Sequence, residues 1–207
     1  MLNLTTQIKI VYLFHLTIHK TMNLNLKKYV KHKKKFLNKK FCNQVIKSLD
    51  NYDWNTHEFY NGKHFHKLSG NQELAVSRGK QKDPNVEIIM KKLWFEIKDY
   101  IDKLKFPWFD GWQGYSLIQY NKYNLNKKMA EHCDHITTLF AGQGIPILSL
   151  LIVLNDDYEG GEFIMFKNIE YKFKAGDLLI FPSNFLYPHR VNPVKKGTRY
   201  SVVSWVW

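Results

Sequence analysis

The second half of the chain is a series of short apolar segments separated by turns, and this pattern constrains the fold more than any other feature. The turns are rich in Gly and Asp, as in 156–161 and 175–177. We expect strands at 115–120, 147–154, 162–166, 171–173, 178–181, 187–191 and 200–207. Short strands with closely spaced turns are typical of β-sandwiches and jelly rolls. The sequence therefore predicts an antiparallel β-rich core.

Two helices are expected ahead of these strands. Apolar residues within 42–49 recur three and four positions apart, as on one helical face, and Asn38 is a suitable N-cap. A longer helix begins at Asp83, which can act as its cap and is followed by a proline suited to the first turn. Its apolar stripe extends from Val86 to Leu104. The expected fold class is thus α+β and mainly β, with packing helices preceding a jelly roll.

The length of 207 residues suits one domain. We expect residues 1–21 to be a disordered extension and 22–207 to be a single domain, with a helical part at 22–110 and a β core at 114–207. The apolar run 8–18 is too short to span a bilayer, so no membrane span is expected.

The net charge of +13 comes almost entirely from lysine, with eight lysines in 27–40. One interpretation is attraction to nucleic acid or to an anionic membrane surface. The other is the coding bias of an AT-rich cellular or viral genome. We favour the second, because nucleic-acid surfaces usually also use arginine and this chain has three, Arg78, Arg190 and Arg199. The two cysteines make no disulfide framework, which indicates the cytoplasm, or the host cytoplasm for a viral protein.

The segment His132-Cys133-Asp134 carries the first sign of chemistry. In an extended chain, residues two apart share a face, so the imidazole and the carboxylate converge while Cys133 points away. Such a short motif arises often by chance and needs context. His189, 57 residues downstream in another expected strand, would complete two histidines and one carboxylate. This facial set suits Fe(II) and leaves three positions open for substrate and O2.

Arg199 lies ten residues after His189. A guanidinium can bind a carboxylate through two parallel hydrogen bonds, which lysine cannot do. We therefore expect Arg199 to bind the far carboxylate of a dicarboxylic co-substrate, with Ser201 adding a hydroxyl on the same face. His135 has the wrong parity to join His132 and is at best a substrate-facing residue.

Residues 115–207 resemble the 2-oxoglutarate/Fe(II) dioxygenase superfamily, and within it the prolyl 4-hydroxylase-like branch. The resemblance depends on Tyr123, His132/Asp134, 158–162, Gly176-Asp177, His189 and 197–201. It implies a double-stranded β-helix with His132, Asp134 and His189 as catalytic iron ligands. It also implies that Tyr123, or failing that Tyr120, hydrogen-bonds 2-oxoglutarate. The implied activity is hydroxylation of a protein side chain, prolyl residues included, or of a small molecule, with ascorbate as a reductant.

The sequence departs from relatives of two kinds. Collagen-type prolyl hydroxylases usually carry an arginine where Pro146 stands and a lysine in place of Arg199. Demethylases that repair nucleic acid typically carry a second arginine after the co-substrate arginine, and none follows here. Two alternatives stay open: a lysine-rich β-barrel that binds nucleic acid without catalysis, and a cupin-type metal enzyme.

Residues 51–82 show little periodicity and are expected to form loops and irregular strands. Together with 135–144 they are expected to line the substrate entrance. His57, His64 and His66 lie in the first of these stretches, and no carboxylate or further ligand sits at a useful metal-ligand spacing from them. We therefore expect no metal role for these three histidines.

Overall fold

The computed structural model describes residues 25–60, 65–66, 73–107, 109, 111–135 and 144–207. The expected extension 1–21, with its apolar run, lies outside the described residues, as does His64.

The helical elements come from the first half of the chain: η1 (Leu26–Tyr29), α2 (Lys39–Ser48), η2 (Leu49–Asn51) and α3 (Pro84–Leu104). The strands are β1 (Lys31–Lys33), β2 (Asn55–Thr56), β3 (Phe59–Tyr60), β4 (Phe65–His66), β5 (Ala75–Arg78), β6 (Gln119–Tyr123), β7 (Met129–His132), β8 (Leu148–Val153), β9 (Glu159–Gly160), β10 (Phe163–Met165), β11 (Ile169–Tyr171), β12 (Leu178–Pro182), β13 (His189–Val191), β14 (Val194–Lys196) and β15 (Arg199–Val206).

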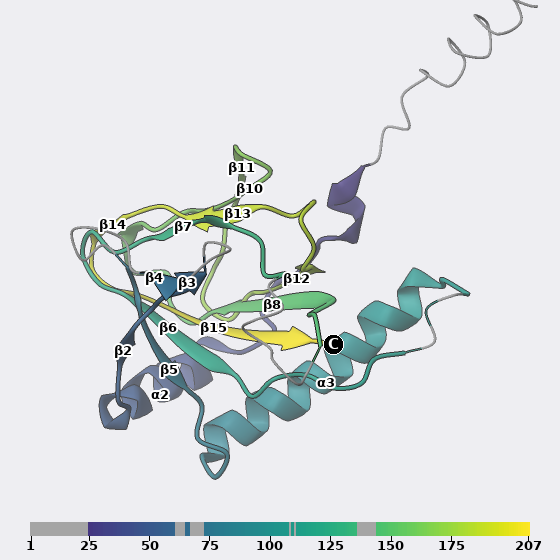
Figure 1. Cartoon of the computed structure of the whole chain (residues 1–207). Coiled ribbons are helices and arrows are strands. Elements are labelled where there is room, and N and C mark those ends of the chain that lie inside the picture. The colour runs from purple at the N-terminus through teal and green to yellow at the C-terminus, as the bar shows by residue number, and fades with distance from the viewer. Residues whose placement is uncertain (1–24, 61–64, 67–72, 108, 110, 136–143) are drawn as a thin grey trace, which may run out of the picture.

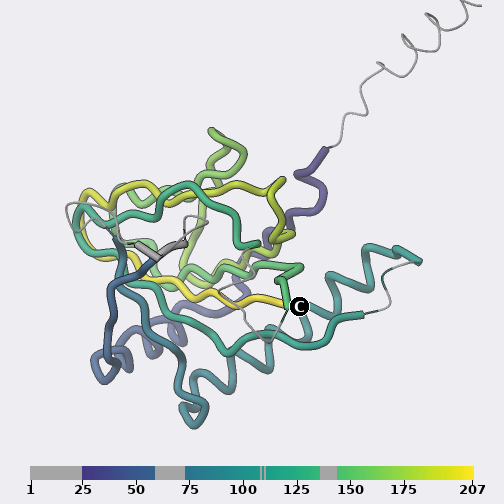
Figure 2. The backbone as a smooth tube through the Cα atoms, viewed as in Figure 1, coloured from purple at the N-terminus to yellow at the C-terminus, as the bar shows by residue number. Residues whose placement is uncertain are grey.

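Two antiparallel sheets organise the described part of the chain (Figure 1). The larger has the order β1-β12-β8-β15-β6-β5-β2, and the smaller has the order β11-β10-β13-β7. Helices α2 and α3 lie on one side of the larger sheet, and the smaller sheet lies on its other side, as the tube view also shows (Figures 1 and 2). The expectation of a mainly β chain with a few packing helices is confirmed.

Alternate residues of the larger sheet supply two separate cores. Leu150 and Ile152 of β8 pack with α2 and α3 in one apolar cluster. Leu151, between them in the sequence, packs toward the smaller sheet in a second cluster that includes Phe163 and Val191. All six residues of β8 are buried, because the strand is covered on both faces. This explains why 148–153 reads as a continuous apolar run rather than an alternating one.

Both helix starts agree with the sequence. The side chain of Asn38 accepts a hydrogen bond from the Phe41 amide at 2.8 Å, and Asp83 accepts one from the Asn85 amide at 2.8 Å. Helix α3 ends at Leu104, where Lys105 adopts a left-handed conformation. Over the described residues, no helix is both long enough and apolar enough to cross a membrane.

The lysine-rich stretch 27–40 takes part in the fold itself. It contains β1, which adds an edge strand to the larger sheet by pairing with β12. Lys31 bonds Asp99 of α3 at 2.5 Å, and Lys33 bonds Glu96. The strand is held by acids more than sixty positions away, so no local pattern reveals it.

Several strands also begin or end at residues other than those expected from the sequence. The strand expected at 115–120 begins only at Gln119, with a single bridge from Tyr115 to Val206 before it. Gly160, within the turn expected at 156–161, instead belongs to β9, which pairs with the distant β14. Gly160 and Gly161 both have positive φ, at 74° and 63°.

Candidate metal centre

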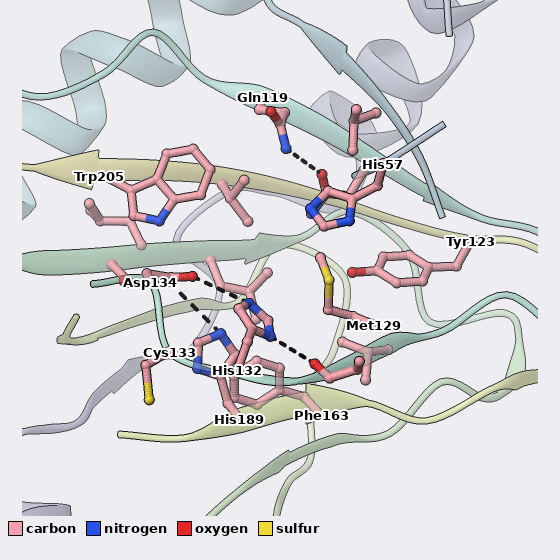
Figure 3. Close-up of a pocket in the computed structure, with 18 of the residues that line it drawn as sticks. His57, Gln119, Tyr123, Met129, His132, Cys133, Asp134, Phe163, His189 and Trp205 are labelled. Atoms are coloured by element: carbon pink, nitrogen blue, oxygen red, sulfur yellow. Dashed lines mark hydrogen bonds and ion pairs between the residues drawn. The ribbon is translucent and has the colours of Figure 1, made fainter. Parts of the chain in front are cut away.

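His132, Asp134 and His189 converge at one point between the two sheets. Their nearest ligand atoms all lie within 4.8 Å of one another, and no other such group of His, Cys, Asp and Glu side chains occurs among the described residues. His132 ends β7 and pairs directly with His189 of β13. Asp134 lies two residues beyond His132, so the extended segment turns both side chains toward the same point (Figure 3).

Backbone carbonyls fix the orientation of both imidazoles. Nδ1 of His132 lies 2.8 Å from the Ala130 oxygen, and Nδ1 of His189 lies 3.1 Å from the Tyr187 oxygen. A carbonyl only accepts hydrogen bonds, so each Nδ1 carries a proton and each Nε2 is left with a lone pair. The Nε2 atoms of His132 and His189 lie 3.3 and 3.9 Å from the Asp134 oxygens. This arrangement is typical of metal-binding histidines.

Ser149 of β8 holds the carboxylate from the larger sheet. Its Oγ donates a hydrogen bond to Oδ2 of Asp134 at 2.6 Å and lies 2.8 Å from Oγ of Ser183. The sequence reasoning missed Ser149, because it lies within an apolar run and meets Asp134 only once β8 and the β7 segment face each other. Cys133 points away from the three side chains, as expected (Figure 3).

Burial and mutual charge keep Asp134 and His189 in the ionisation states that a metal ion requires, whereas the pKa of His132 is raised, because its contact with Asp134 outweighs the opposing effect of burial. Burial and, after it, the charge of the neighbouring His132 lower the pKa of His189 to about 4. Burial also opposes charge on Asp134, but the two histidines outweigh it and lower the pKa of Asp134 below its ordinary value. The site therefore presents a carboxylate anion beside a neutral His189 at pH 7.

Arg199 is fully buried at the start of β15 and lies opposite Tyr123 of β6. Its Nη1 donates to Oγ of Ser201 at 3.1 Å, as the shared face predicted. Its Nε and Nη2 have no hydrogen-bond partner among the described residues. Buried guanidinium donors without acceptors are costly, so this geometry suits an anionic ligand.

Gly161 makes room for the Arg199 side chain. A Cβ atom at Gly161 would lie 3.1 Å from Cδ of Arg199 and 3.2 Å from the ring of Tyr158. The backbone there also has φ of +63°, which favours glycine. The role of this glycine is thus to let the buried arginine extend, rather than to form a hairpin.

The two tyrosines proposed for the co-substrate lie on opposite faces of β6. Tyr123 lines the pocket, and its hydroxyl points into it (Figure 3). Tyr120 does not reach the pocket: it packs in the helix-facing core, 5.2 Å from the ring of Tyr52. They are three positions apart, so the two-residue period of the strand places their side chains on opposite faces. His135 is exposed and is not among the lining residues either.

The pocket has a volume of about 630 Å³, within the range of small-ligand sites. Its wall includes the three convergent side chains, Tyr123, Gln119, Asn121 and Trp205. The stretch 51–82, which we expected to line the substrate entrance, contributes His57, Glu58, Glu73, Val76 and Arg78 to the pocket wall. His57 is not part of the metal cluster, but it has a carboxylate partner, Glu73, that the sequence spacing did not suggest.

Residues 118–207 match the family model of the 2OG-Fe(II) oxygenase superfamily. This part of the chain belongs to that superfamily. Among curated relatives of the oxygenase region, a PKHD-type hydroxylase of Crocosphaera subtropica is 34% identical over 96 residues, which cover 43% of the chain and 41% of that protein. A PKHD-type hydroxylase of Prochlorococcus marinus is 32% identical over 145 residues, covering 68% and 63%. The chain thus spans about two fifths to two thirds of the length of these relatives.

Solved structures of prolyl hydroxylases share the fold. A prolyl hydroxylase from Trichoplax adhaerens, solved with a hypoxia inducible factor peptide fragment, aligns with a TM-score of 0.66 at 16% identity, covering 100% of this chain and 94% of that one. A prolyl-4-hydroxylase from Pseudomonas putida aligns with a TM-score of 0.61 at 15% identity, covering 86% and 91%.

Proposed function

We propose that the protein is an Fe(II)- and 2-oxoglutarate-dependent hydroxylase acting on a protein side chain or a small molecule. The observation that carries the proposal is the His132/Asp134/His189 cluster in a pocket that Tyr123 also lines, with the buried, partly unpaired guanidinium of Arg199 packed against the Tyr123 ring. Names of relatives and structural neighbours add support, since they include PKHD-type and prolyl hydroxylases. A prolyl substrate is one member of the proposed class.

The donor set fits the proposed metal. Two neutral imidazole nitrogens and one carboxylate oxygen form the ligand set of non-haem Fe(II) oxygenases, with coordination positions left open. His132, Asp134 and His189 would hold the ion, and Ser149 would keep the carboxylate turned toward it. When bound, Fe(II) and 2-oxoglutarate would allow O2 to act as the oxidant: one oxygen atom would enter succinate as 2-oxoglutarate loses CO2, and the other would enter the substrate.

The protein's own part is to bind, orient and exclude water. Arg199 would pair with the far carboxylate of 2-oxoglutarate, while Ser201 and the Tyr123 hydroxyl would hydrogen-bond it. Apolar side chains of both sheets, including Leu151, Phe163 and Phe181, exclude water from that end of the pocket. Ascorbate would serve only as an external reductant.

We further propose that the two facing sheets form a double-stranded β-helix. The interleaved strand order supports this, because β12 and β8 of the larger sheet alternate along the chain with β10 and β13 of the smaller one. The second half of the chain then supplies every proposed iron and co-substrate ligand from the inner faces of the two sheets.

Anaerobic titration of the purified chain with Fe(II) and then 2-oxoglutarate tests the proposal, followed by measurement of succinate after air is admitted. We expect binding of both and uncoupled succinate release, lost in Asp134→Ala. A folded protein that binds both components but never forms succinate would contradict the proposed hydroxylase activity.

Surface ion pairs weaken the alternative of a lysine-rich β-barrel that binds nucleic acid without catalysis. Lys31 and Lys33 are paired with acids of α3, and Lys98 and Lys103 with acids one helical turn away, so these four lysines are locally compensated. A cupin-type enzyme would leave the buried Arg199 without a role.

A further inference from the structure

A second ionisable pair lies in the wall of the pocket, apart from the proposed iron ligands. Glu73 is 2% exposed, and its Oε2 lies 3.0 Å from Nδ1 of His57. Because a carboxylate only accepts hydrogen bonds, His57 is the donor and locks the side chain in place. The second oxygen, Oε1, is buried and has no hydrogen-bond partner among the described residues. A buried carboxylate oxygen without a donor is costly, and a donor from a ligand would offset that cost.

The pair faces the same chamber as the proposed iron site. Glu73 and His57 both line the pocket, and the imidazole of His57 points into it (Figure 3). A group held by Glu73 would therefore lie within the reaction chamber and not in a separate cavity.

Among the described residues, His57 is the ion-pair partner of Glu73, and Lys128, whose backbone bridges to that of Glu73, forms no ion pair with it. Arg78 also lines the pocket, but it is five residues along an extended segment, on the order of 16 Å away. Glu131 is already paired with Arg190 at 3.2 Å. With Fe(II) and 2-oxoglutarate bound, the charges of the ion, the co-substrate, Asp134 and Arg199 would cancel. The charge of Glu73 would remain, buried in a chain whose net charge is +13.

We propose that Glu73, fixed by His57, binds a cationic group of the substrate, an ammonium or a guanidinium. The inference rests on the proposed function for the statement that this ligand is the substrate. The chemistry itself is independent of that, since an ammonium or guanidinium supplies both the donor that Oε1 lacks and the missing positive charge. Glu73 is then a specificity-determining residue, and His57 positions it.

The test measures binding without turnover, in the full chain loaded with redox-inert Zn(II) and 2-oxoglutarate. The probes are N-acetyl-lysine methylamide, N-acetyl-arginine methylamide and the neutral N-acetyl-norleucine methylamide, titrated by ligand-observed NMR. We expect at least one cationic probe to bind about 10-fold or more tightly than the neutral one. In Glu73→Gln that preference should fall to within about twofold, with 2-oxoglutarate affinity unchanged. The matched control is Glu58→Gln, an exposed carboxylate of the same wall, which should keep the preference.

Two results would overturn the inference: no cation preference in wild-type protein that binds 2-oxoglutarate, or a preference that survives in Glu73→Gln. Failure of the proposed function would instead appear as absent metal and 2-oxoglutarate binding in the first titration. Should Glu73→Gln fail to fold, carbodiimide coupling of the lysine probe to wild-type protein decides the matter. An amide link on Glu73 found by peptide mapping supports the inference, and labelling confined to other carboxylates overturns it.

Discussion

Arg199 and Tyr123 occupy directly opposed positions on β15 and β6, and the guanidinium carbon lies 4.9 Å from the centre of the tyrosine ring. The ring supports one face of the guanidinium and leaves its edge donors Nε and Nη2 available. Loss of the charge should therefore remove co-substrate binding.

We expect Arg199→Met to weaken 2-oxoglutarate binding by about 100-fold, the scale of a buried charge pair. Titration calorimetry with Zn(II)-loaded protein measures this. Arg190→Met is the matched control, because Arg190 points toward Glu131 and the Lys167 carbonyl. The 2-oxoglutarate affinity of this variant should stay within about threefold of wild type. Equal affinities of the two variants would contradict the role of Arg199.

Tyr123 and Tyr120, the two tyrosines of β6, provide a second test variant with its matched control. Tyr123→Phe should reduce 2-oxoglutarate affinity by up to about 10-fold, the value of one hydrogen bond, whereas Tyr120→Phe should leave it unchanged. Tyr120 faces the helix-side core, so only its effect on stability is expected. Loss of affinity in Tyr120→Phe alone would reverse the assignment.

Asp134→Ala should reduce Fe(II) affinity by at least about 100-fold, since a direct ligand contributes more than an outer-shell partner. Anaerobic equilibrium dialysis measures the affinity. The neighbouring exposed residue provides the control: His135→Ala should bind the metal like wild type. A chelator should lower the melting temperature of metal-loaded wild-type protein and leave that of Asp134→Ala unchanged.

Ser149→Ala removes the hydroxyl that donates to Asp134. We expect a loss of metal affinity of about 10-fold, because the carboxylate is no longer held toward the imidazoles. Ser204→Ala on β15 is the matched control. The hydroxyl of this buried serine contacts Ser116 and not Asp134, so the metal affinity of the variant should equal that of wild type. Equal losses in both variants would indicate general loosening of the larger sheet.

The docking of β1 predicts a pH dependence of stability. Hydrogen bonds from Lys31 and then Lys103 lower the pKa of Asp99 from 3.8 to about 2. A lowered pKa means that the charged form stabilises the fold above about pH 3.8, and that this contribution disappears as the pH falls through 2. Asp99→Asn should therefore be less stable than wild type at pH 6 and equally stable near pH 2. The difference should be small, since the carboxylate is 44% exposed. Urea unfolding at several pH values measures it, and a gap that persists at pH 2 would exclude the charge as its cause.

Local chemistry accounts for what could be predicted from the sequence. The caps at Asn38 and Asp83 depend on residues within one turn, and His132 and Asp134 share a face in any extended segment. The placement of Tyr120 depended on the register of β6 against β15, which no local pattern sets. The partners of Lys31 and Glu73 lie 68 and 16 positions away along the chain, so β1 and the pair with His57 became visible only in the folded structure.

His132 and His189 face each other across β7 and β13, and Asp134 is tied to Ser149 of the opposite sheet. An ion bound to all three would therefore link the two sheets across the pocket. Strand β7 is the edge of its sheet, and its pairing with β13 is irregular between His189 and Val191. In the metal-free protein this edge should open most easily, so amide hydrogen exchange in β7 would report iron occupancy before any catalytic assay does.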